Sequence, residues 1–156
     1  MTAKFTVLGN TTLATASSTM TFSSIPSGYK DLALVVETTL TGGASINFRL
    51  NNDSGSNYSF VIMRGNGSAA DSGTTSSGTQ GTFGYSVGKS LVRIDLLDYS
   101  ATDKHKPLLS RLDNSTYAFA HANKWAGTSA VNRIDFILTG GESFAAGSTF
   151  RILGVN

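Results

Sequence analysis

Apolar residues recur at every second position in short runs along almost the whole chain. Val92, Ile94 and Leu96 alternate with Arg93 and Asp95. Residues 32–37, 46–51 and 133–138 repeat this alternation. Because successive side chains of a strand point to opposite faces, this alternation predicts strands with one face on a core. Nowhere are apolar residues spaced three and four apart, as a long helix requires.

Glycine, serine, threonine and asparagine fill the segments between these runs. Residues 51–57 (Asn-Asn-Asp-Ser-Gly-Ser-Asn) lie between two strand patterns and predict a hairpin connection. Short strands with tight turns predict an all-β fold, an antiparallel, jelly-roll-like β-sandwich of about eight to ten short strands. The 156 residues contain no linker-like segment, so we expect a single β-sandwich domain, 1–156.

One segment departs from the strand pattern. Residues 65–78 contain only small or polar side chains, so they cannot dock on a core. We expect Gly65 to Gly78 to be an exposed, mobile loop. A loop of this length is either a partner contact or a solvated segment without a role.

Residue types that carry catalysis are scarce. The chain has no cysteine, two histidines (His105 and His121) and two glutamates. Disulfide scaffolds and thiolate zinc sites are therefore excluded. Paired carboxylates for glycoside hydrolysis and a nucleophile elbow are not evident. We expect a protein that is not an enzyme and needs no cofactor or metal.

Charge is low and dispersed. Only 14% of the residues are charged and the net charge is +2, so no nucleic-acid partner is predicted. The cluster Lys104-His105-Lys106 is interpreted as solvated charge at a strand edge. Neither a signal peptide nor a membrane-spanning apolar run is found, which predicts synthesis in a cytoplasm and no membrane partner.

Several segments, taken in order, resemble small β-rich structural proteins of tailed bacteriophages. Phe22 to Leu32 fits an F-x-x-I-P-x-x-Y-x-x-L motif, and Phe48 to Tyr58 carries a turn of F-N-x-D-x-G-x-N-Y type. Ile94 to Tyr99 and Phe150 to Val155 are also similar to segments of those proteins.

This resemblance implies a virion component made in the host cytoplasm. A capsid decoration (cement) protein on the capsid exterior is favoured. Its partners would be the major capsid protein and its own copies, with which it would form a homotrimer. The alternative is a tail or head-fibre domain that binds a host receptor or surface glycan. Because the chain begins at Met1 without a shaft or repeat before the β domain, decoration suits it better.

Residues 117–125 form an aromatic and amide strand. Alternation places one set of side chains, Tyr117, Phe119, His121, Asn123 and Trp125, on one face of the strand. Three alanines lie on the other face. Such a face could stack on a surface glycan, and Trp125, at a strand end, is expected to be the most exposed. The competing interpretation is that Tyr117 and Phe119 fill the core.

Some strands also carry apolar residues opposite their predicted core face. Either a two-sheet core takes up both faces at these points, or the residues form a subunit interface. These candidate interface residues are Leu91, Ile137, Leu153 and Val155.

Overall fold

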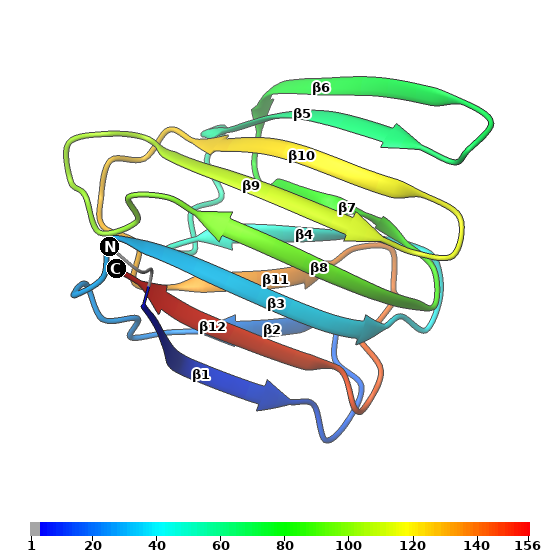
Figure 1. Cartoon of the computed structure of the whole chain (residues 1–156), viewed down its shortest axis with the longest axis horizontal. Coiled ribbons are helices and arrows are strands. Elements are labelled where there is room, and N and C mark those ends of the chain that lie inside the picture. The colour runs from blue at the N-terminus through cyan, green and yellow to red at the C-terminus, as the bar shows by residue number, and fades with distance from the viewer. Residues whose placement is uncertain (1–3) are drawn as a thin grey trace.

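The computed structural model describes residues 4–156, which form two antiparallel sheets packed face to face (Figure 1). The larger sheet has eight strands in the order β1-β12-β3-β8-β9-β10-β5-β6, and the smaller has four in the order β2-β11-β4-β7. The strands are β1 (Phe5–Thr12), β2 (Thr19–Phe22), β3 (Asp31–Thr39), β4 (Ala44–Leu50), β5 (Tyr58–Gly65), β6 (Ala70–Gly78), β7 (Gly81–Ser86), β8 (Lys89–Leu96), β9 (Lys106–Asp113), β10 (Ala118–Trp125), β11 (Ile134–Leu138) and β12 (Thr149–Val155).

The connections alternate between the two sheets. Only the connections β5–β6, β8–β9 and β9–β10 join neighbours in one sheet. All the remaining connections between the described strands cross from one sheet to the other. Such crossing is typical of jelly-roll sandwiches. The all-β, antiparallel, jelly-roll-like class is therefore confirmed, although residues 4–156 contain twelve strands and not eight to ten. These residues form no helix, and hence none that could span a membrane.

A continuous hydrophobic core fills the space between the sheets. The inward face of β8, with Val92, Ile94 and Leu96, is fully buried, as the period-two pattern predicts. Phe48 of β4 stacks on Phe83 of β7 with ring centroids 4.4 Å apart. Both sheets contribute to this core, so the alternation on each strand follows from one shared interior.

The predicted loop Gly65 to Gly78 is wrong in part, because most of it is strand β6. Residues 70–78 pair with β5 through the backbone and form the exposed edge of the larger sheet. Asn66 Oδ1 accepts hydrogen bonds from the N–H groups of Ser68 and Ala69 and so shapes the turn before β6. The strand depends on backbone pairing and not on core burial, which explains why side-chain periodicity gave no sign of it.

The predicted hairpin at residues 51–57 is also wrong, because β4 and β5 belong to different sheets. The segment crosses the sandwich and is organised by Asp53. Asp53 Oδ1 accepts a hydrogen bond from Gly55 N at 2.8 Å, and Oδ2 accepts one from Asn57 Nδ2 at 2.9 Å. Asn51 and Asn52 have φ of 52° and 57°, a left-handed conformation that asparagine tolerates.

The larger sheet extends beyond the smaller one. β7 is the edge of the smaller sheet, whereas β5 and β6 continue the larger sheet past it (Figure 1). The inward faces of β5 and β6 therefore have no complete sheet opposite them. This overhang leaves an opening between the two layers.

Candidate binding surfaces

The aromatic strand β10 has the predicted alternation, but its aromatic and amide face points into the sandwich. Phe119, His121, Asn123 and Trp125 are buried and Tyr117 is half-buried, whereas Ala118 and Ala122 are exposed. Trp125 is only 4% exposed, so the expectation that it is the most exposed is wrong. The residues proposed for a glycan face thus do not lie together on the surface.

Asn123 and Trp125 are occupied by internal hydrogen bonds. Asn123 Nδ2 donates to Thr82 O at 3.0 Å, and Asn123 Oδ1 accepts from Thr82 N at 3.2 Å. The side-chain amide therefore satisfies the edge of β7 as a neighbouring strand would. Trp125 Nε1 donates to Asp53 Oδ2 at 2.6 Å. Burial raises the pKa of Asp53, but this bond and those from Asn57 and Gly55 outweigh it and lower the pKa.

Lys106 is buried and not solvated, contrary to the interpretation of the Lys104-His105-Lys106 cluster. Its Nζ donates to Lys104 O at 2.7 Å and to Thr128 O at 3.1 Å. Burial lowers the pKa of Lys106. β9 lies inside the larger sheet, between β8 and β10, and is not an edge strand.

The four candidate interface residues do not form one surface. Leu91, Leu153 and Val155 lie on the outer face of the larger sheet, whereas Ile137 lies on the outer face of the smaller sheet. Leu91 pairs in register with Glu37 and Asp113, so its neighbours are acidic. Sequence alternation could not distinguish the two outer faces because both have the same period.

Leu153 and Val155 belong to an apolar area that sequence reasoning did not assemble. Val7 of β1 pairs with Leu153, and Phe5 pairs with Val155. Phe5 and Val7 are both more than half exposed. These four side chains are here called the β1–β12 patch.

A second apolar area lies farther across the same face. Ala122 pairs with Val61 of β5 and with Leu109 of β9, and Ala120 pairs with Met63. The small alanine side chains leave a shallow hollow of about 440 Å³ beside Met63 and Leu109. We call this area the alanine groove. Arg93, Asp95 and Arg111 also line it, with Arg93 bonded to Asp95 at 2.8 Å.

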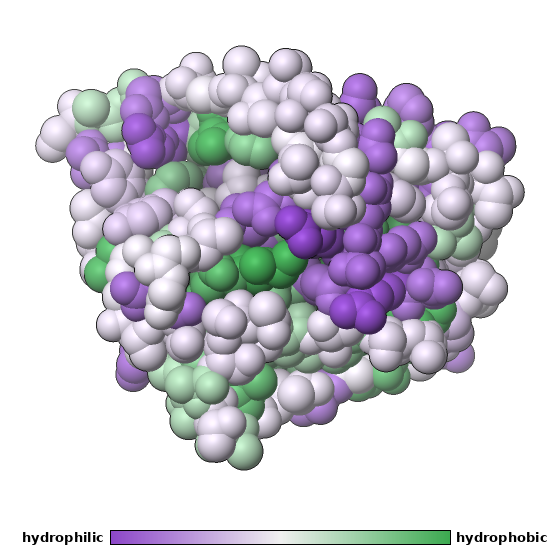
Figure 2. Space-filling view, turned by 180° about the vertical axis from the view of Figure 1, so that it is seen from behind, coloured by the Kyte–Doolittle hydropathy of each residue, from purple (hydrophilic) through white to green (hydrophobic). Residues whose placement is uncertain are grey.

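On the outer face of the smaller sheet, polar side chains gather beside a central hydrophobic area (Figure 2). Arg133 Nη2 donates to Asp135 Oδ1 at 2.7 Å, and Thr21 Oγ1 donates to the same carboxylate at 2.6 Å. Arg49 lies opposite Asp135 in register. Burial raises the pKa of Asp135, but these hydrogen bonds and the two arginines lower it overall. This face is therefore built around internally paired charge.

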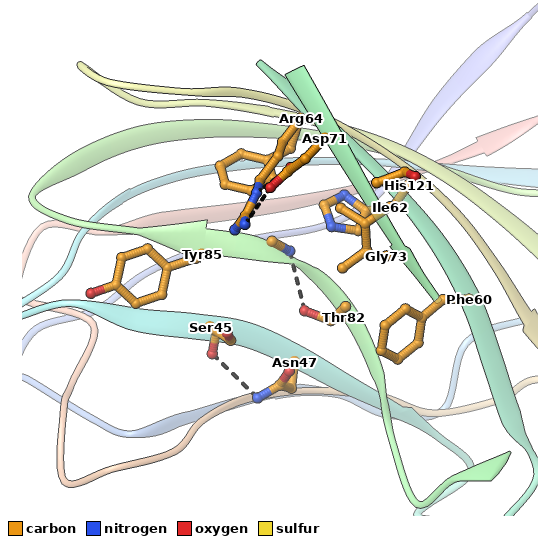
Figure 3. A pocket seen from close by; sticks show the side chains of 13 residues that line it. Ser45, Asn47, Phe60, Ile62, Arg64, Asp71, Gly73, Thr82, Tyr85 and His121 are labelled. Carbon is orange, nitrogen blue, oxygen red and sulfur yellow. Dashed lines mark hydrogen bonds and ion pairs between the residues drawn. The ribbon is translucent and has the colours of Figure 1, made fainter. Parts of the chain in front are cut away.

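Beneath the β5–β6 hairpin the two layers enclose a cleft of about 330 Å³ (Figure 3). Its apolar wall consists of Phe60 and Ile62 of β5 and Phe119 of β10. Arg64 and Asp71 form an ion pair on the same side, with Nη2 of the arginine 2.7 Å from Oδ2 of the carboxylate. The opposite wall comes from the smaller sheet and carries Ser45, Asn47, Thr82 and Tyr85.

His121 lines this cleft and is only 3% exposed. Neither Nδ1 nor Nε2 has a hydrogen-bond partner. Burial lowers the pKa of His121 to about 4, so the ring is neutral at pH 7. A neutral imidazole offers one donor and one acceptor, and both are unused.

Sequence reasoning missed the cleft because its residues come from five strands of two different sheets, β4 to β7 and β10, and the pattern along the chain does not show which sheet a strand joins. The alternation of Phe60 and Ile62 on β5 was the available signal, but period two does not tell whether the inward face is covered. No group of three histidine, aspartate or glutamate side chains among residues 4–156 could hold a metal ion.

No protein-family model and no curated protein sequence matches the chain. Among solved structures it is similar to galectin LEC-6 of Caenorhabditis elegans, with a TM-score of 0.44, 9% identity and coverage of 94% of this chain and 95% of the galectin. It is also similar to an alginate lyase variant in complex with alginate tetrasaccharide, with a TM-score of 0.33, 12% identity and coverage of 88% and 78%. Both TM-scores are below 0.5, so the sandwich class rests on the strand order itself.

Proposed function

We propose that this protein is a non-enzymatic structural component of a tailed-phage virion, namely a capsid decoration protein that binds and stabilises the major capsid shell. The resemblance of Phe22 to Leu32 and Phe48 to Tyr58 to such proteins supports this assignment. The observation that carries it is the outer face of the larger sheet, where the β1–β12 patch and the alanine groove are both exposed.

The two apolar areas suit a protein that bridges neighbouring subunits. Burial of the apolar surface of either area in a contact stabilises the complex by roughly 25 cal/mol per Å² of apolar surface. They lie on one face but on different strands, β1–β12 and β5–β10–β9. One can therefore contact a capsid subunit while the other contacts a second subunit or another copy of this chain in a homotrimer. When the same contact is repeated over the capsid lattice, even a modest stabilisation per contact adds up to a large one.

Cryo-electron microscopy of the virions tests this proposal, with the sandwich fitted into the map and its copies counted. The proposal predicts trimers at symmetry-related positions on the capsid exterior, with the outer face of the larger sheet against the shell. Copies found only at the tail or on sparse projections would contradict it. That outcome would favour the alternative, a tail or head-fibre domain that binds a host receptor or glycan.

A further inference from the structure

We infer that the cleft beneath the β5–β6 hairpin binds a neutral sugar, with His121 in its wall as a hydrogen-bond partner. The inference is independent of where the protein lies on a particle. It uses a different surface from the outer face of the larger sheet.

The size and walls of the cleft define the class of ligand. A volume of about 330 Å³ lies at the lower end of the range for small-molecule sites. Phe60 and Phe119 offer aromatic surface on one side, and Ser45, Asn47 and Thr82 offer hydroxyl and amide groups on the other. Figure 3 shows Phe60 and Ile62 on the β5 side of the cleft and Ser45, Asn47 and Thr82 on the side of the smaller sheet. A pyranose ring has the matching character, since its C–H face is apolar and its edge carries hydroxyl groups.

Charge in the cleft favours a neutral ligand over an ionised one. Arg64 donates to both carboxylate oxygens of Asp71, at 2.5 and 2.7 Å, so each charge is already paired. His121 is uncharged at pH 7. An anionic or cationic ligand would have to compete with the existing ion pair.

His121 supplies the independent sign of a ligand. Its two ring nitrogens are buried without partners, which costs free energy that a hydrogen-bonding ligand would recover. The ring lies beside Ile62 and Gly73 in the wall of the cleft (Figure 3). A sugar hydroxyl both donates and accepts, and so matches a neutral imidazole.

Gly73 provides a way to fill the cleft without disturbing the fold. It pairs with Ile62 and lines the cleft, and a Cβ built there has no neighbour within 4 Å. Gly73→Leu therefore places a side chain in the ligand space. Thr74→Leu is the matched control, because Thr74 pairs with Val61, which is exposed on the outer face.

The experiment is saturation-transfer NMR of the full chain with methyl glycosides of glucose, galactose, mannose and N-acetylglucosamine, and with methyl glucuronide as the charged comparison. At least one neutral glycoside is expected to bind, with binding about tenfold weaker or more in Gly73→Leu and unchanged in Thr74→Leu. His121→Phe, which replaces the imidazole with an aromatic ring that has no nitrogen, is expected to weaken binding while the protein stays folded by circular dichroism.

Three results would overturn the inference. The first is that none of the neutral glycosides binds the wild-type protein. The second is binding to folded Gly73→Leu or His121→Phe that equals the wild type. The third is a preference for the glucuronide, which would replace the neutral ligand with an anionic one.

Discussion

His121 and Lys106 are both buried in the larger sheet, yet their nitrogen atoms are satisfied differently. Lys106 Nζ donates to two backbone carbonyls, whereas both ring nitrogens of His121 lack partners. Burial lowers the pKa of each. Lys106 therefore supports the backbone around it, whereas burial of His121 makes stability depend on pH.

The pH dependence of stability between pH 6.5 and 4 should report His121. Its pKa falls from 6.5 to about 4 on folding, so the unfolded chain binds the proton more readily. The stabilisation is complete above pH 6.5 and is lost as the pH falls towards 4, by no more than about 3 kcal/mol. Urea unfolding at pH 7 and 4.5 should show this loss in the wild type and in the His105→Asn control, and a smaller loss in His121→Phe. An equal loss in all three would contradict the assignment.

Lys106→Met should destabilise the fold by about 1–3 kcal/mol, because the carbonyl oxygens of Lys104 and Thr128 lose their donor. The methionine side chain has similar length, so lost packing should contribute little. Lys104→Met is the control, since Lys104 is exposed and its Nζ lies 3.6 Å from Asp98. Equal unfolding free energies for the two variants in urea would show that the buried hydrogen bonds of Lys106 do not matter.

At the scale of elements, β10 links the two sheets through its buried face. Asn123 replaces a missing strand at the edge of β7, and Trp125 binds Asp53 in the crossing segment between β4 and β5. The strand therefore stabilises both the open edge of the smaller sheet and the connection between layers.

Asn123→Ala should cost about 2–4 kcal/mol, because it leaves both the N–H and the C=O of Thr82 unpaired in a buried position. Lys124→Ala, an exposed change on the same strand, should stay within about 0.5 kcal/mol of the wild type. Urea unfolding measures both. Similar values for the two variants would mean that the amide does not support the β7 edge.

Fluorescence should report the position of Trp125, the only tryptophan of the chain. Because it is 4% exposed, its emission should be blue-shifted relative to the urea-unfolded protein and resist quenching by acrylamide. Quenching as fast as in the unfolded chain would contradict its burial.

Periodicity predicts most strands because most have one face on the core. β8 and β11 are recognised by Val92, Ile94, Ile134 and Phe136, which are all buried. β6 escapes because its small and polar side chains bury little, and its place depends on the backbone of β5. The assignment of β4 and β5 to different sheets could not be predicted for a related reason, since alternation carries no information on which strands pair.

The site was harder to predict than the fold. Alternation on β10 identifies the shared face of His121, Asn123 and Trp125, but not whether another sheet covers it. The cleft arises because the larger sheet outgrows the smaller one at β5–β6, a property of strand order. The alternation pattern of a single sequence does not reveal that strand order.

At the scale of the whole molecule, the unequal sheets give the protein two distinct surfaces. The outer face of the larger sheet carries the β1–β12 patch and the alanine groove, whereas the overhang at β5–β6 forms the cleft. The first surface suits contact with a flat protein partner and the second suits a small ligand. The proposed role in the virion depends only on the first.

Two exposed leucines on the outer face of the larger sheet allow a direct test of that role. Leu109 is 51% exposed at the alanine groove, and Leu91 is 44% exposed between Glu37 and Asp113. The measurement is co-sedimentation of wild type, Leu109→Ser and Leu91→Ser with capsid shells stripped of this protein. The decoration role predicts saturable binding of the wild type and of Leu91→Ser, with occupancy reduced in Leu109→Ser. Failure of the wild-type protein to bind the shells, or equal binding of all three, would contradict it.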